Sequence, residues 1–195
     1  MKRIIPTAEA ALQAVSHAAC IIGGWFVILL SFGICVEVVL RKVFNASLQG
    51  IDEYGGYALA TTASLGLAYC FYEHAHIRID LVVRKLPRPV GRLLAVLAIA
   101  ILGVVVAMLA LEAYRLTEES QMFGAFSNTP LRTPMVYPQA IWTAGFCLFF
   151  LAILVRLLHL FQTVLTGDEA GTAELLGENA SGAGSVDGAR VQGLE

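Results

Sequence analysis

The residues best suited to chemistry stand in one short stretch, where Glu73, His74, His76 and Asp80 follow each other closely. Imidazole and carboxylate groups bind zinc and other transition metals. On a helix, however, residues two positions apart point to different sides, so His74 and His76 do not reach the same ion. No further cluster of His or Cys residues supports a site. We therefore expect the chain to bind no metal.

Two other histidines stand at the ends of apolar runs, His17 before the first run and His159 after the last. Two imidazoles that face each other inside a bundle can hold a haem iron. Here both stand at helix ends on the same membrane face rather than midway through a bundle. We expect no haem and no other cofactor, and a haem-bearing membrane anchor of a respiratory enzyme stays open as an alternative function.

A carboxylate, Glu37, stands near the end of the first apolar run, and Arg41 follows four residues later. A charged side chain at the centre of a membrane helix costs about 2.5–3.5 kcal/mol, and less near the interface. We expect the two side chains to form an ion pair close to the lipid headgroups. The alternative is a site for a proton or cation, as an autonomous four-span small carrier would need.

The sequence shows no pairing of a nucleophile with a base, no phosphate-binding loop and no dinucleotide-binding fingerprint, so we expect no enzymatic activity. It shows no nucleic-acid-binding patch either, because basic residues gather only beside the apolar runs. The cysteines form no Cys-x-x-Cys pair and stand inside apolar runs, which predicts buried free thiols. They are Cys20, Cys35, Cys70 and Cys147.

The elements that must position these residues are membrane-spanning helices. Of the 195 residues, 57% are hydrophobic and 14% are charged, and the mean hydropathy of +0.73 is too high for a soluble domain of this size. The apolar runs predict an all-α membrane protein with four transmembrane helices, because about 20 residues cross a bilayer. We place the spans at about 18–40, 54–72, 90–114 and 135–159.

The segment between the second and third spans is short and strongly basic, from Arg78 to Arg92. Such a loop marks the cytoplasmic side, so both termini are predicted to be cytoplasmic. Its apolar residues fall on one helical face, which predicts a short amphipathic segment on the membrane surface. The predicted domains are an N-terminal cytoplasmic segment (1–17), a membrane domain (18–165) and a disordered cytoplasmic tail (166–195).

The second span carries small residues at every fourth position, a spacing that lets another helix approach closely in lipid. We call these residues the ridge: Gly56, Ala60, Ser64 and Ala68. The second span is therefore the predicted packing centre. Asp52 and Glu53 stand just before it, where negative charge favours the start of a helix and where a partner outside the membrane could be contacted.

These features follow each other in an order that resembles the small membrane subunit of tripartite ATP-independent periplasmic (TRAP) transporters, from about Ala18 to His159. Asp52 stands where glutamate is expected, which keeps the charge. The motifs that carry the resemblance are Arg41-Lys42-Val43-Phe44, Asp52-Glu53, His76-Ile77-Arg78-Ile79-Asp80, Thr129-Pro130 and Pro134.

The resemblance implies a multi-pass protein of the bacterial cytoplasmic (inner) membrane. In such systems an extracytoplasmic solute-binding protein captures an organic acid, and a large permease subunit carries it inward with sodium ions. The small subunit packs against the large one and helps to dock the binding protein. Four unbroken, nearly charge-free spans fit this accessory role, and we expect no substrate-binding residue on this chain. Besides the ridge, the expected scaffold or interface residues are Glu37, Arg41, Asp52, Glu53, His76, Arg78 and Asp80.

Overall fold

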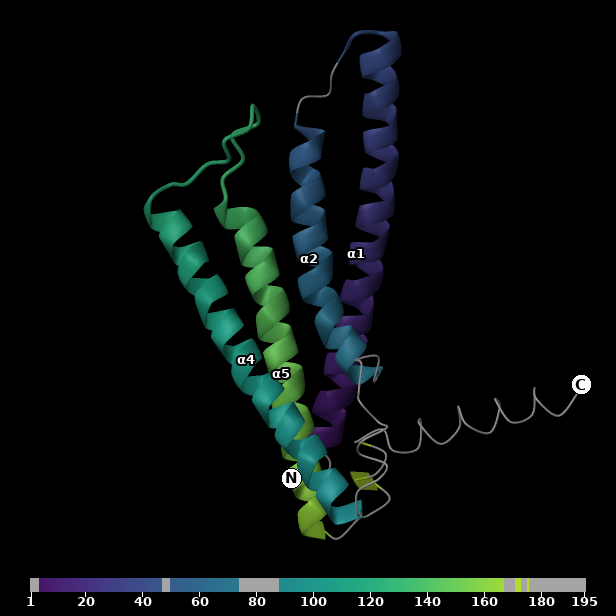
Figure 1. Ribbon diagram of the computed structural model, residues 1–195, viewed down its shortest axis with the longest axis vertical. Helices are drawn as coiled ribbons and strands as arrows, with labels where there is room; N and C mark the ends of the chain where they lie inside the picture. The colour runs from purple at the N-terminus through teal and green to yellow at the C-terminus, as the bar shows by residue number, and fades with distance from the viewer. Residues whose placement is uncertain (1–3, 47–49, 74–87, 167–170, 173–174, 176–195) are drawn as a thin grey trace, which may run out of the picture.

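The computed structural model describes residues 4–46, 50–73, 88–166, 171–172 and 175. Across this part of the chain it contains four long helices and no strand (Figure 1). The predicted all-α architecture is therefore confirmed for these residues. The helices are α1 (Ile4–Val43), α2 (Ile51–Tyr72), α4 (Arg88–Met122) and α5 (Val136–Thr166).

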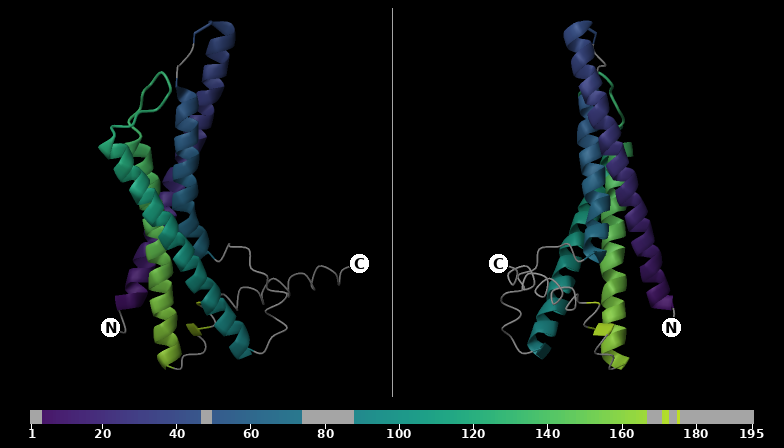
Figure 2. Two further views of the ribbon diagram at one scale, coloured as in Figure 1. Left: turned by 60° about the vertical axis from the view of Figure 1, so that its left-hand side comes forward. Right: turned by 90° about the vertical axis from the view of Figure 1, so that its right-hand side faces the viewer.

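The four helices alternate in direction and form two hairpins, α1 with α2 and α4 with α5 (Figure 1). Helix α2 lies between α1 and α5 and packs against both, while α4 packs against α5. The start of α1 and the end of α5 lie at one end of the bundle, which we call the base (Figures 1 and 2). At the opposite end, which we call the far end, the two hairpins stand apart (Figure 1).

Helix α1 is much longer than the span predicted for it. Its 40 residues extend about 60 Å, whereas the hydrocarbon core of a bilayer is about 30 Å thick. The helix runs without a break through most of the predicted N-terminal segment, because Pro6 stands in the first turn, where proline is tolerated. The first turns of α1 therefore extend the bundle at its base beyond the predicted span of 18–40.

Three of the described helices, α1, α4 and α5, are long and apolar enough to cross a membrane. Helix α2 is not among them, because glycine, threonine and serine replace large apolar residues along much of its length. A helix that packs against neighbours on two sides needs fewer large apolar side chains than one that faces lipid. The predicted span at 54–72 stays a prediction.

The core of the bundle forms where α2, α4 and α5 meet. Phe71 of α2 and Phe149 of α5 pack edge to face with ring centroids 5.9 Å apart. By contrast, large apolar side chains such as Trp25 and Phe32 on α1 are exposed, as expected of a surface that faces lipid. The buried cluster consists of Ala68, Phe71, Tyr72, Ile99, Val106, Phe149, Ala152, Ile153 and Leu160.

Several predicted features fall on residues that the structure does not describe. The amphipathic segment between α2 and α4 spans 74–87, so the placement of His76, Arg78 and Asp80 lies outside the described residues. The predicted tail of 166–195 is described only at residues 166, 171, 172 and 175. Of these, Thr172 is buried and Leu175 packs against the core cluster.

Candidate functional site

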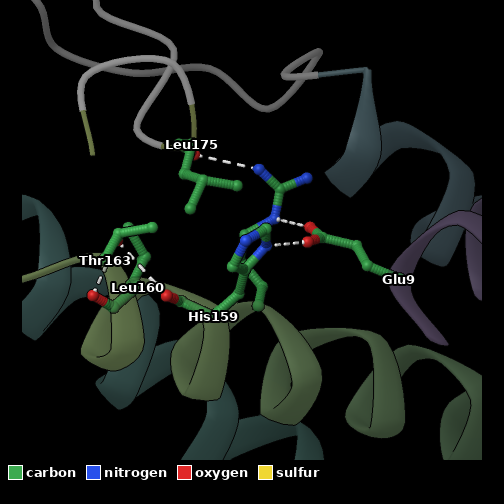
Figure 3. Close-up of polar contacts among 6 residues, drawn as sticks. Glu9, His159, Leu160, Thr163 and Leu175 are labelled. Carbon is green, nitrogen blue, oxygen red and sulfur yellow. Dashed lines mark hydrogen bonds and ion pairs between the residues drawn. The ribbon is translucent and has the colours of Figure 1, made fainter. Parts of the chain in front are cut away.

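A buried ionic cluster joins the first and last helices at the base. Glu9 of α1 contacts Arg156 of α5, with 2.6 Å between Glu9 Oε1 and Arg156 Nε (Figure 3). The other carboxylate oxygen of Glu9 contacts Nδ1 of His159, one turn further along α5 (Figure 3). The side chains of Arg156 and Glu9 are only 8% and 10% exposed. Removing one partner of such a pair leaves an uncompensated buried charge, which costs about 3–5 kcal/mol.

The guanidinium of Arg156 extends this cluster to two more elements. Its central carbon lies 5.8 Å from the ring centroid of Phe71 and 5.4 Å from that of Tyr72, at the end of α2. A cation at this distance from an aromatic face is attracted to it. Nη1 of Arg156 also donates a hydrogen bond to the backbone carbonyl of Leu175, at 3.0 Å (Figure 3). One side chain therefore connects α1, α2, α5 and the C-terminal segment.

This cluster is the part of the site that the sequence did not reveal. His159 stands at the end of the last predicted span and Arg156 falls within that span, but their spacing does not point to Glu9, because His159 and Glu9 stand 150 positions apart. The sequence offered only a weak signal. Arg156 and His159 stand three positions apart on one apolar helix, and Glu9 and Glu37 are the only charged residues between Ile4 and Leu40.

A second polar cluster stands at the far end, centred on Glu53 of α2. Tyr57, one turn along the helix, donates a hydrogen bond to Glu53 Oε1 at 2.5 Å, and Thr129 of the α4–α5 loop donates one to Oε2. Ser127 lies 2.9 Å from Thr129, hydroxyl to hydroxyl. The donated hydrogen bonds of Thr129 and Tyr57 stabilise the carboxylate and lower the pKa of Glu53.

The α4–α5 loop also packs against the start of α2. Gly50 has a left-handed backbone, with φ +94°, which a side chain would strain. A Cβ at this position would also overlap the side chain of Leu131. Within the loop, the Ser127 amide donates to the Thr133 carbonyl at 2.9 Å. These contacts join the α4–α5 loop to the start of α2.

Glu37 and Arg41 form the predicted ion pair within α1, with 2.7 Å between Glu37 Oε1 and Arg41 Nη2. An ion pair close to the lipid headgroups was expected, but the two side chains differ in how far they are buried. Glu37 is 1% exposed, whereas the Arg41 side chain is 57% exposed. Gly33, one turn earlier on α1, lies against Ile51 of α2, so this stretch of α1 faces the start of α2. The carboxylate is therefore enclosed by the protein while its arginine reaches outward.

The ridge on α2 divides into two halves. Ser64 and Ala68 are buried, and a Cβ built on Gly145 of α5 would lie 2.5 Å from Ser64 Oγ and 2.9 Å from its backbone carbon. Ala60 is half-buried, and Gly56 is exposed, with no described atom within 4 Å of a Cβ built there. This chain thus fills the half of the ridge nearer the base with α5 and leaves the half nearer the far end open.

The structure does not bring the other candidate residues together in one site. The ring of His17 lies 5.4 Å from that of Tyr69, while His159 contacts Glu9, so the two imidazoles have different surroundings. The side chain of Asp52 lies outside the described residues. Among the described side chains, no three of the His, Cys, Asp or Glu type form a metal-binding group.

The four cysteines are free thiols, but the prediction that all are buried was wrong. Cys20 and Cys70 are half-buried, whereas Cys35 and Cys147 are exposed. A position inside an apolar run is buried in protein only on the side of the helix that packs, and the remaining sides of a membrane helix face lipid. Hydropathy along the chain does not distinguish these two environments.

Comparison with known proteins adds one match. The family model for the DctQ component of tripartite ATP-independent periplasmic transporters matches residues 30–163, more than half of the chain. No curated protein matches. The matched range covers the far end of α1, all of α2 and α4, and most of α5, including Arg156 and His159. Glu9 and Leu175, the two contacts of Arg156 from the ends of the chain, lie outside it.

Proposed function

This chain belongs to the DctQ component family of the tripartite ATP-independent periplasmic transporters, and on that premise we propose how it contributes to transport. As the small membrane subunit, it scaffolds the large permease and helps to dock the extracytoplasmic solute-binding protein. The assembly takes up an organic acid together with sodium ions across the bacterial inner membrane. Both termini of this chain face the cytoplasm, with the base on that side.

The observation that carries the accessory role is the continuity of the helices. Carriers that bind their own substrate are typically built from broken helices whose ends meet near the middle of the membrane. Here α1, α4 and α5 run without interruption for 40, 35 and 31 residues. The buried carboxylates, Glu9 and Glu37, stand near opposite ends of α1 and each contacts an arginine. This arrangement supports a subunit that positions others rather than one that moves solute.

The open half of the ridge supports contact with the large permease. Hydrophobic transfer provides little driving force between helices in lipid, so close packing against small residues has to supply it. Gly56 and Ala60 present such a surface, and the described part of this chain does not cover Gly56. A helix of the large permease packed on this half of α2 would complete the ridge.

The far end supports docking of the solute-binding protein. The α4–α5 loop is joined to the start of α2 through Glu53 and Thr129 and through the contact between Gly50 and Leu131. A platform that keeps its shape before binding loses less conformational entropy when a partner docks. The lowered pKa of Glu53 keeps its carboxylate charged to a lower pH than an ordinary glutamate, so these hydrogen bonds persist into mild acid.

Reconstitution into lipid vesicles tests the proposal. Vesicles that hold this chain together with the large permease, supplied with the binding protein and a sodium gradient, should accumulate one member of a panel of radiolabelled organic acids. Vesicles that lack this chain, the permease or the sodium gradient should not. Uptake by this chain alone would contradict the accessory role and favour an autonomous carrier, in which case Glu37→Gln should abolish that uptake.

A further inference from the structure

A short described piece of the C-terminal segment lies against the base of the bundle. Residues 171, 172 and 175 are helical, Thr172 is 5% exposed, and Leu175 packs against the buried cluster that includes Phe71 and Leu160. A solvated tail would not bury a residue to this extent. These three residues, which we call the strap, therefore form part of the folded bundle.

The strap covers the side chain that holds the base together. Arg156 Nη1 donates to the carbonyl of Leu175 at 3.0 Å, and Nε of the same guanidinium contacts Glu9 at 2.6 Å. Nε meets Glu9 as an ion pair and not in hydrogen-bond geometry. A guanidinium is a rigid, planar group, so a hydrogen bond that holds Nη1 also limits where Nε can lie. The position of the Leu175 carbonyl is thus linked to the distance between Nε and Glu9.

We propose that the strap is a clamp that orients Arg156 and thereby keeps the start of α1 packed against α5. With the strap in place, the buried guanidinium has a carboxylate, a backbone carbonyl and two aromatic faces as neighbours. Without it, Nη1 loses this carbonyl while the guanidinium is still buried, and the cost of that loss favours a guanidinium that swings out to water. The pair with Glu9 then breaks, and the first turns of α1 separate from α5.

The clamp joins residues inside the range matched by the family model to residues outside it. Glu9 and Leu175 lie outside the residues that the family model matches, whereas Arg156 lies inside them. The strap therefore couples the two ends of this chain to one residue of the part shared with the family. Contact between the first turns of α1 and α5 at the base thus depends on the strap, which follows the end of α5 and can be removed without shortening any of the four helices.

Truncation tests this dependence on the full four-helix chain. One variant ends at Ala170 and lacks the strap, while a matched control ends at Glu178 and keeps it. Both carry a single cysteine, Ser16→Cys, in a background in which the four native cysteines are replaced by alanine. Ser16 is fully buried on α1, two turns beyond Glu9, so its labelling by a maleimide in detergent reports opening of the base. Thr166→Cys, at the exposed end of α5, is the reference for labelling without protection.

We expect Ser16→Cys to react roughly tenfold faster in the chain that ends at Ala170 than in the full chain, because local opening controls access to a buried thiol. The chain that ends at Glu178 should react like the full chain. Equal rates in the chain that ends at Ala170 and in the full chain would overturn the proposal, as would equal acceleration in both truncations.

A second measurement keeps the proposal testable if the shorter chain does not fold. In the full chain, Thr172→Cys should label roughly tenfold more slowly than Thr166→Cys, because Thr172 is covered when the strap is closed. Arg156→Lys keeps the positive charge but lacks the planar fork, so it should remove this protection. Thr172→Cys that labels as fast as Thr166→Cys in the otherwise unchanged chain, or protection that survives Arg156→Lys, would overturn the clamp.

Discussion

The base and the far end of the bundle hold their elements together by different means. At the base, charged side chains pair between helices, with Glu9 of α1 against Arg156 of α5 in a setting nearly closed to solvent. At the far end, Glu37 pairs with Arg41 inside a single helix, and Glu53 accepts hydrogen bonds from hydroxyl groups. The helices of the two hairpins converge at the base, where ion pairs cross between them, and stand apart at the far end, where the α4–α5 loop contacts α2 through Thr129 (Figure 1).

This difference indicates where contacts within this chain set the distance between the two hairpins. An interhelical ion pair in a low-dielectric setting resists separation strongly, because each partner would be left as an unpaired buried charge. At the far end, the pair of Glu37 with Arg41 lies within one helix, and the α4–α5 loop reaches α2 through the hydroxyl hydrogen bond of Thr129 to Glu53. Loss of such a hydrogen bond costs less than separation of a buried ion pair, so the far end restricts the distance between the hairpins less strongly. The base therefore sets the geometry of the bundle, while the far end, with its exposed half of the ridge, is the region suited to fit other subunits.

The largest expected effect comes from breaking the base. Arg156→Gln leaves the Glu9 carboxylate buried without its cation and should lower the stability of the chain by about 3–5 kcal/mol. The matched control is Arg115→Gln, which breaks the exposed pair with Glu112, at 2.7 Å and 69% and 68% exposed, and should cost at most about 1 kcal/mol. Thermal unfolding in detergent measures both, and equal losses would show that the base cluster contributes no more than a surface ion pair.

The next effect comes from the close approach of α2 and α5. Gly145→Ala places a methyl group 2.8 Å from Ser64 Cβ and 2.9 Å from its backbone carbon, so the helices must move apart, and we expect a loss of about 1–3 kcal/mol. Gly24→Ala on α1 meets no described atom within 4 Å and should be neutral or stabilising, by up to about 1 kcal/mol from helix propensity. If both variants melt at the same temperature, α2 and α5 do not touch at this point.

A smaller, pH-dependent effect is expected from Glu53 at the far end. Its pKa in the folded state is lowered from the ordinary value of 4.5, so its stabilisation is fully present above pH 4.5 and is lost as the pH falls through the folded-state pKa. The difference in melting temperature between the unchanged chain and Glu53→Gln should be constant near neutral pH and shrink in acid. A difference that grows as the pH falls would contradict the direction of the shift.

The smallest effect on the chain itself is expected at the open half of the ridge. Gly56 is exposed, and a Cβ built there meets no described atom within 4 Å, so Gly56→Leu should lower neither the membrane level nor the melting temperature. The same change should prevent a partner helix from approaching and so remove most of the large permease that co-purifies in detergent. Leu59→Phe, on an exposed position of the same helix, is the control. Equal recovery of the permease with both variants would show that the open half of the ridge faces lipid.

The all-helical architecture, the approximate positions of three spanning helices and the family were accessible from the sequence, whereas the start of α1 at Ile4 was not. Runs of apolar residues long enough to cross a bilayer are a local property, and they located α1, α4 and α5 without reference to any other part of the chain. The motifs around Arg41 and Glu53 and the order of the spans indicated the TRAP small subunit, which the family match over 30–163 confirms. The ion pair of Glu37 with Arg41 was equally local, because a four-residue separation on a helix places the two side chains together.

The tertiary structure alone decided which residues meet across helices. Glu9 falls in the predicted N-terminal cytoplasmic segment (1–17), and only the crossing of α1 with α5 buries it against Arg156. Likewise, a spacing of four made the ridge a single surface, but the approach of Gly145 to Ser64 divides it into a filled and an open half. Hydropathy and periodicity describe one helix at a time, whereas burial and ion pairing between helices depend on how far apart, and at what angle, two remote segments pack.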